Sequence, residues 1–159
     1  MNKWLIPIMI MIMIILVLAG CSVPGRLTGR DRPPDAMIEI NGRRYETVLG
    51  TYCWQYGNKG TCVDTAGPVE LLKGKEPIPV EAGAGIRFVM EDDWPLKEFH
   101  VSQHDGDQIT DVKLNEDGSF HAPQQPGIYY YSYGVWWKDE KKPNVSHGDA
   151  FYNFVIEVK

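Results

Sequence analysis

The chain has 159 residues, of which 43% are hydrophobic, and it carries 21 acidic side chains against 16 basic ones, a formal net charge of −5. This length is typical of a single domain with a core of its own. The acidic balance argues against a nucleic-acid partner, because nucleic-acid binding requires a basic surface.

The chain opens with the features of an exported protein. Lys3 precedes an apolar run over residues 4–19, and the run closes at Leu18-Ala19-Gly20-Cys21. A charged start, an apolar stretch and a small-residue end are typical of a secretory signal peptide. The alternative is an uncleaved membrane anchor. The run has 16 residues, fewer than the roughly 20 that a helix needs to cross a bilayer.

The ending Leu18-Ala19-Gly20-Cys21 resembles the lipobox of bacterial lipoprotein precursors. This resemblance implies that the thiol of Cys21 receives a diacylglyceryl group and that a peptidase cuts just before it. Residues 1–20 are then the signal peptide, and the lipid holds the protein at the outer face of the cell membrane. Removal of Lys3 with that peptide leaves 15 basic and 21 acidic residues, a net charge of −6.

A flexible linker is predicted over residues 21–35, where proline and glycine recur without apolar periodicity. It contains Arg26, Arg30 and Arg32, each of which would contribute about 1 kcal/mol of attraction to anionic lipid. The alternative is a solubilising tether whose arginines have no role of their own. The folded domain is expected to cover residues 36–159.

A first hairpin is predicted where the domain begins. It joins residues 36–40 to residues 43–48 through a two-residue Asn41-Gly42 turn, one of the strongest hairpin signals. The turn places Glu39 opposite Arg44 on a polar face, while the other face is apolar. One apolar and one polar face are typical of a sheet that is packed on one side.

A second hairpin is predicted around a Gly57-Asn58 turn. Counting outward from this turn places Cys53 opposite Cys62 on a non-hydrogen-bonded pair, where the Cα spacing suits a disulfide. An exported protein would pair these two thiols and leave Cys21 for the lipid. The alternatives are a metal-thiolate site and a redox pair. Neither is favoured, because the hairpin contains no Cys-x-x-Cys motif and no histidine.

The rest of the domain is predicted to be mostly strands. One short helix is expected near residues 68–73, with Pro68 at its first position and Gly74 after its end. The expected strands are 78–80, 86–91, 96–104, 108–114, 119–122, 127–138 and 150–159. Many short strands with little helix favour an all-β sandwich. The last two strands resemble the closing pair of an immunoglobulin-like domain, which implies an immunoglobulin-like antiparallel β-sandwich.

From residue 38 onward the chain is also similar to small uncharacterised lipoproteins of Gram-positive bacteria. The segments that carry this similarity are Gly50–Trp54, Cys62–Asp64 and Pro68–Leu71. The similarity implies a location and a fold, and it brings no assigned activity.

Polar side chains alternate along the strand predicted over residues 96–104, so four of them point the same way: Glu98, His100, Ser102 and His104. Imidazole and carboxylate groups are ligands for zinc and copper. Residues four apart on a strand are about 13 Å apart, so His100 and His104 would need a further ligand, such as His121 or His147. A solvent-facing polar edge is favoured, and no metal or cofactor is expected.

Aromatic residues are in surplus on the strand predicted over residues 127–138. One face carries Tyr129, Tyr131, Tyr133 and Trp137, and the other carries Tyr130 and Trp136. Both sets cannot face one core, so exposed rings are expected on the strand or near the second hairpin turn. Exposed Trp and Tyr suit carbohydrate stacking or protein contact. The candidate ligand-binding residues are Trp54, Tyr56, Trp136 and Trp137, but an aromatic core with an edge covered by residues 139–149 is the favoured interpretation.

The sequence contains no Gly-x-Ser-x-Gly, phosphate-binding glycine loop or His-Glu-x-x-His motif. Ser102 is not expected to join a catalytic triad, because residues two apart on a strand do not aim at a shared point. We therefore expect a non-catalytic binding or structural domain whose partner is a protein or a cell-wall ligand. The alternatives are carbohydrate binding through exposed aromatics and metal binding through converging histidines.

Overall fold

The computed structural model describes residues 31–90, 98–138 and 146–159. The strands are β1 (Ala36–Ile40), β2 (Arg43–Glu46), β3 (Val48–Tyr56), β4 (Lys59–Val63), β5 (Ile78–Val80), β6 (Gly85–Met90), β7 (Glu98–Asp105), β8 (Gln108–Asp111), β9 (Phe120–His121), β10 (Gly127–Lys138) and β11 (Ser146–Val158). One short helix, α2, spans Pro68–Leu71. No described helix is long and apolar enough to cross a membrane.

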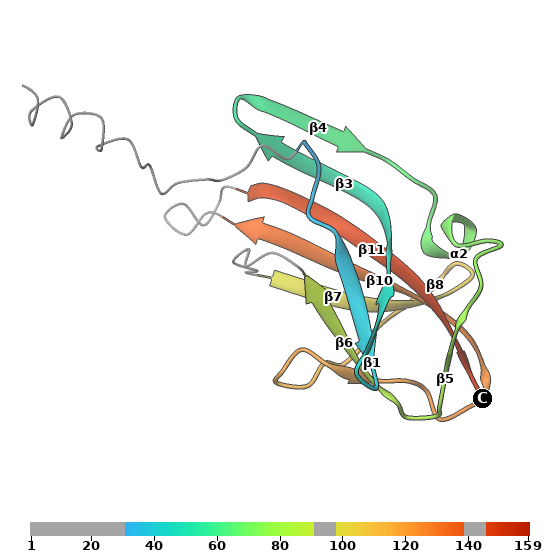
Figure 1. Cartoon of the computed structure of the whole chain (residues 1–159). Coiled ribbons are helices and arrows are strands. Elements are labelled where there is room, and N and C mark those ends of the chain that lie inside the picture. Colours follow the sequence, from blue (N-terminus) through green and yellow to red (C-terminus); the bar gives the residue numbers. More distant parts are fainter. Residues whose placement is uncertain (1–30, 91–97, 139–145) are drawn as a thin grey trace, which may run out of the picture.

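These strands form two sheets that pack face to face, which confirms the predicted all-β sandwich (Figure 1). The small sheet has the order β2-β1-β6-β9, and the large sheet has the order β4-β3-β11-β10-β7-β8. In the large sheet, β5 also pairs with β11. That pairing is parallel, a departure from the expected antiparallel arrangement, because β5 enters beside the end of β11 after a crossing from β4 through α2.

The hairpin of β1 and β2 has the predicted register, with Glu39 opposite Arg44. Asn41 and Gly42 both have positive φ angles, 51° and 75°, as a type I′ turn requires. The second strand ends at Glu46, two residues earlier than predicted. The Thr47 hydroxyl donates a hydrogen bond to the Ala36 carbonyl at 2.6 Å, and the chain then crosses to the large sheet as β3.

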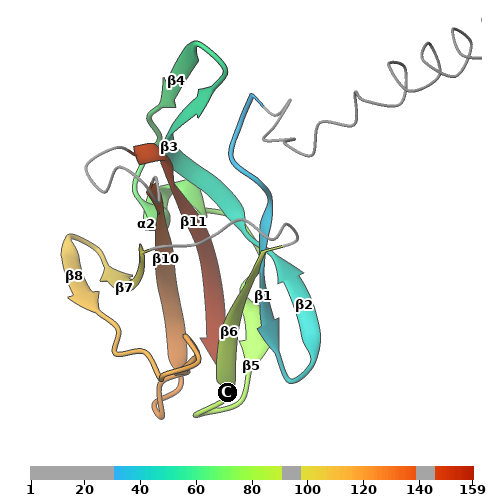
Figure 2. The same ribbon diagram turned by 90° about the vertical axis from the view of Figure 1, so that its left-hand side faces the viewer.

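The hairpin of β3 and β4 also has the predicted register, and Cys53 and Cys62 are joined by a disulfide. Their Cα atoms are 4.1 Å apart, close to the spacing of a non-hydrogen-bonded antiparallel pair. Gly57 has the positive φ angle, 56°, that this turn needs. In Figure 2 the hairpin projects from one end of the large sheet.

Two predicted strands differ from their predicted limits by three or more residues at one end. Strand β8 ends at Asp111 rather than 114; the Val112 amide still bonds to the Val101 carbonyl, and the side chains of Val112 and Leu114 pack against the core. Strand β11 begins at Ser146 rather than 150, because its polar first residues pair with the end of β10 and with β3. The first residues of β11 show no alternation of apolar and polar side chains, so only their backbone pairing identifies them as part of the strand.

The core lies between the sheets and is largely aromatic. On β10, the residues of one face are buried: Tyr131, Tyr133, Val135 and Trp137. Phe88 of the small sheet stacks on Tyr133 with 3.5 Å between the ring centroids. The aromatic core predicted from the sequence is therefore present, but only one face of β10 contributes to it. Burial raises the pKa values of the phenol groups of Tyr131 and Tyr133.

Packing begins before the predicted start of the domain at residue 36. Pro33 and Pro34 are fully buried, and the hydroxyl of buried Tyr152 donates a hydrogen bond to the Pro34 carbonyl at 2.6 Å. The last residues of the predicted linker therefore belong to the core. This contact fixes the point where the chain enters the sandwich.

Candidate functional site

The four aromatic residues predicted to meet a ligand do not share one environment. Trp54 and Trp137 are 1% and 2% exposed, and their rings pack edge to face with 5.1 Å between the centroids. Both point into the core, so neither offers an exposed ring to a ligand as the prediction requires. Tyr56 is half-buried and packs against the core at the end of β3. Only Trp136 lies on the outer face of the large sheet.

Trp136 lies in a depression of the outer face that Gly134 creates. A Cβ atom at residue 134 would come within 2.8 Å of the indole of Trp136 and within 2.9 Å of the ring of Phe151. Gly134 pairs with Phe151 on one side and with His100 on the other. A side chain at residue 134 would therefore occupy the space that the Trp136 ring now fills.

Phe151 and His100 enclose the indole from the two neighbouring strands. The Phe151 ring lies 5.6 Å from the Trp136 ring at an angle of 87°, and the His100 ring lies 5.6 Å away at 74°. We call Trp136, Phe151 and His100 the aromatic shelf. Trp136 and Phe151 are partly exposed and His100 is exposed, so the shelf is open to solvent.

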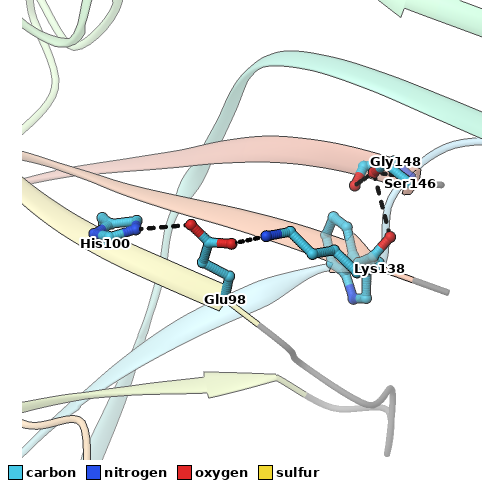
Figure 3. A network of polar contacts seen from close by, with 6 residues as sticks. Glu98, His100, Lys138, Ser146 and Gly148 are labelled. Atoms are coloured by element: carbon cyan, nitrogen blue, oxygen red, sulfur yellow. Dashed lines mark hydrogen bonds and ion pairs between the residues drawn. The ribbon is translucent and has the colours of Figure 1, made fainter. Parts of the chain in front are cut away.

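Two carboxylates flank Trp136 in register. Glu98 of β7 pairs with Trp136 on one side, and Asp149 of β11 pairs with it on the other. Glu98 accepts a hydrogen bond from Lys138, and its second oxygen lies 3.3 Å from a ring nitrogen of His100 (Figure 3). These contacts, with Lys138 first, lower the pKa of the Glu98 carboxyl group. Asp149 forms no ion pair or side-chain hydrogen bond with another described residue.

A cavity of about 240 Å³ adjoins the shelf where β11 begins beside the β3–β4 hairpin. Asp149, which pairs with Trp136, is among the residues that line the cavity, together with Gln55, Thr61 and His147. The disulfide forms part of its wall. Ser146 fixes the start of β11, since its hydroxyl donates to the Gly148 carbonyl at 3.0 Å (Figure 3). The shelf and the cavity together offer an aromatic surface, open carboxylate oxygens and hydroxyl and amide groups.

The histidines stay apart in the structure. His100 and His104 both lie on the outer face of β7, as predicted, and His121 lies on β9 of the small sheet, with its Nδ1 3.1 Å from the Gly83 carbonyl oxygen. His147 lines the cavity beside β3. Within the described ranges, no three histidine, cysteine or acidic side chains come together as metal ligands.

Ser102 and His104 lie closer together than the sequence analysis expects. The Ser102 hydroxyl is 2.9 Å from His104 Nε2, although the two residues are two apart on one strand. The imidazole is long enough to lean along the strand over the short serine side chain. The expectation that the two side chains do not meet is therefore wrong. In the described part of the chain no carboxylate contacts the other nitrogen of His104, so these two residues form a pair and not a triad.

The sequence analysis missed three residues of this site: Gly134, Phe151 and Asp149. Asp149 pairs with Trp136 across β10 and β11, and Phe151 pairs with Gly134, over which the indole of Trp136 lies. Phe151 lies on the predicted last strand, whereas Asp149 lies just before its predicted start, so the pattern did not indicate that the two residues share a face. Comparison with family models, curated proteins and solved structures finds no match for this chain.

Proposed function

We propose that this protein is a non-catalytic binding domain, that a lipid on Cys21 holds it at the outer face of the bacterial cell membrane, and that the aromatic shelf binds a glycan of the cell envelope. The observation that carries the glycan proposal is the partly exposed indole of Trp136 between Glu98 and Asp149.

The cysteines support the anchor. Cys53 and Cys62 are bonded to each other, so Cys21 is the one cysteine of the chain that has no disulfide partner in it. Eleven residues separate Cys21 from Pro33, where core packing begins. A chain of that length reaches about 40 Å at most. A lipid on Cys21 would therefore keep the sandwich close to the membrane surface.

The chemistry of the shelf supports a sugar ligand. An aromatic face attracts the apolar C–H face of a pyranose ring, and a tryptophan indole offers the largest such surface of any side chain. Binding sites for small polar ligands combine an apolar surface with a few fixed polar groups. Here Lys138 and His100 hold the Glu98 carboxylate in place, while Asp149 is open to accept hydrogen bonds from hydroxyl groups.

Electrostatics favour a neutral or cationic glycan over an acidic one. The mature chain has a net charge of −6, and two carboxylates flank the shelf against one lysine. A glycan rich in carboxylate or phosphate would meet repulsion at Asp149, which pairs with no cation in the described part of the chain. A polymer of amino sugars or neutral hexoses would not.

A binding assay with defined oligosaccharides tests the proposal. The protein purified from membranes in detergent is titrated with oligomers of glucose, N-acetylglucosamine and glucosamine, and the intrinsic tryptophan fluorescence is recorded. Trp136→Ala should abolish binding, and Trp136→Phe should retain part of it. Tyr130→Ala is the matched control, because it removes a partly exposed ring from the same sheet face away from the shelf. Unchanged binding by Trp136→Ala, or no binding of any of the three sugars, would contradict the glycan proposal.

The anchor has its own test. Cells that express the protein are labelled with a radioactive fatty acid and then fractionated. The label should remain with the protein and be lost in Cys21→Ser, and that variant should leave the membrane fraction. A labelled Cys21→Ser protein would refute the anchor and leave the shelf proposal untouched.

A further inference from the structure

We propose that the outer corner of the large sheet, formed by the β7–β8 hairpin, is a second binding surface. It takes an extended segment of a partner protein that pairs with β8 and carries aliphatic and basic side chains. We call this surface the β8 edge; it consists of Ile109, Asp111, His104, Tyr130 and Ile128. It lies apart from the aromatic shelf and goes beyond the glycan proposal.

The backbone of β8 is open along one side. Strand β8 is the last in the order of the large sheet, and in Figure 2 its hairpin with β7 forms one margin of the molecule. All four of its residues are exposed. Edge strands of this kind are templates for an added strand, and natural proteins commonly cover or disrupt them. Within the described residues, nothing pairs with the outward side of β8.

The pairing register identifies which backbone groups are free. The amide of Val112 donates to the Val101 carbonyl at 2.9 Å, which makes that pair a hydrogen-bonded one. Hydrogen-bonded and non-hydrogen-bonded pairs alternate along an antiparallel ladder. The pairs of Ile109 with His104 and of Asp111 with Ser102 are therefore non-hydrogen-bonded. The N–H and C=O groups of Ile109 and Asp111 consequently point away from β7, toward an incoming strand.

Exposed aliphatic side chains lie beside this open edge. Ile109 is 64% exposed and Ile128 is 55% exposed, and they are the two large hydrophobic residues that stand out as exposed in the described part of the chain. Both lie on the outer face of the sheet, near partly exposed Tyr130 and His104. A cavity of about 200 Å³ between α2 and the hairpin is lined by Val69, His104, Ile128 and Tyr130, among others. It is large enough for an aliphatic side chain of a bound segment.

The negative charge around the β8 edge favours a partner segment with basic side chains. Residues 98–114 contain four acidic residues and one lysine. Asp105, Asp107 and Asp111 are exposed, and none of them forms an ion pair with another described residue. Complementary charge guides association and excludes partners of like charge. Ile109 and Asp111 point to the same face, because they are two residues apart on β8. A strand that adds to β8 can therefore cover Ile109 with an aliphatic residue and place a lysine or arginine near Asp111 two residues further along the same face.

Peptide binding by the full chain in detergent micelles tests the proposal. The probe is a fluorescently labelled eight-residue peptide that carries valine and lysine in turn at every second residue, with threonine between them, so that both types lie on one face of the strand. Binding is followed by anisotropy at about 50 mM salt, where charge pairs are weakly screened. The same peptide with glutamate in place of lysine controls for charge. A valine–lysine peptide with N-methyl groups on alternate residues controls for strand pairing. The first peptide should bind, and each control should bind at least about tenfold more weakly.

Variants localise the binding. Ile109→Asp should weaken binding of the valine–lysine peptide by about tenfold or more, because it removes the apolar contact and leaves the backbone intact. Asp111→Lys should weaken it by about threefold to tenfold. Glu46→Lys is the matched control, since it makes the same change of charge on an exposed residue of the small sheet and should have a much smaller effect. Trp136→Ala should leave peptide binding unchanged.

Three results would overturn the proposal. The first is no binding of the valine–lysine peptide at millimolar concentration, and the second is equal weakening by Asp111→Lys and Glu46→Lys. The third is a concentration-dependent dimer that Ile109→Asp converts to a monomer, because a second copy of the chain would then be the occupant of β8. Analytical ultracentrifugation of the wild-type chain and of Ile109→Asp decides this last case. Circular dichroism checks that the variant is folded.

Discussion

Removal of the Cys53–Cys62 disulfide should lower the free energy of unfolding by about 2.7 kcal/mol. The bond closes a loop of ten residues, because its cysteines are nine apart in sequence. In the chain-entropy treatment, a loop of that size restricts the unfolded chain by about 9 cal/mol/K, which is about 2.7 kcal/mol at 25 °C. For a folded unit over residues 33–159, whose unfolding entropy near the midpoint is about 270 cal/mol/K, the melting temperature should fall by about 10 °C.

The native hairpin should survive this change. Strand β3 is paired with β11 on its other side, and buried Trp54 packs edge to face on Trp137 at 5.1 Å. These contacts do not depend on the sulfur atoms. The disulfide therefore acts mainly on the unfolded chain, and Trp54 should stay buried in the folded state of the double variant Cys53→Ser/Cys62→Ser.

Equilibrium unfolding in guanidinium chloride measures the loss, and acrylamide quenching of tryptophan fluorescence measures the burial. Cys21→Ser is the matched control, because it removes a thiol that lies outside the disulfide and should leave the unfolding free energy unchanged. A loss below about 0.5 kcal/mol, or an increase in quenching of the folded double variant, would refute the reasoning. The second result would mean that the bond maintains the native packing of the hairpin.

Three further changes test the core and its titration. Asn153→Leu should cost about 2–3 kcal/mol in unfolding free energy, because the buried amide donates to two backbone carbonyls at a bulge in β11. Tyr152→Phe should cost about 1–2 kcal/mol by leaving the buried Pro34 carbonyl without its donor. Burial lowers the pKa of His104 below its ordinary value. The unfolded chain then binds more protons, so stability should fall as the pH drops below about 6.5, and His104→Gln should flatten that dependence.

Turn chemistry and periodicity predicted the local parts of this fold. The Asn41-Gly42 dipeptide fixed both the turn type and the register of the first hairpin, because only residues that tolerate positive φ fit there. The count outward from Gly57-Asn58 placed Cys53 opposite Cys62 for the same reason. Alternation along β10 divided its aromatic residues between two faces, and burial in the structure shows that the face with Tyr131, Tyr133 and Trp137 is the inner one. Each of these inferences uses residues that are neighbours in the chain.

The shelf depends on pairing between distant strands, and local patterns do not specify that register. His100, Gly134 and Phe151 meet because β7, β10 and β11 align in one particular way. That alignment follows from how the inner faces of these strands fill the core. Local patterns also do not show that Trp54 is buried and Trp136 is partly exposed, because this depends on the direction in which each side chain points from its strand. Burial assigned Trp54 to the core.

The two proposed binding surfaces should act independently. Trp136 and Tyr130 are six residues apart on β10 and point the same way, which separates them by about 20 Å along the strand. Effects of substitutions that are more than about 10 Å apart and share no partner usually add. Trp136→Ala and Ile109→Asp should therefore each remove one binding activity and leave the other, and their combination should remove both. The two proposals thus place the glycan at one end of the outer face of the large sheet and the protein segment at the other.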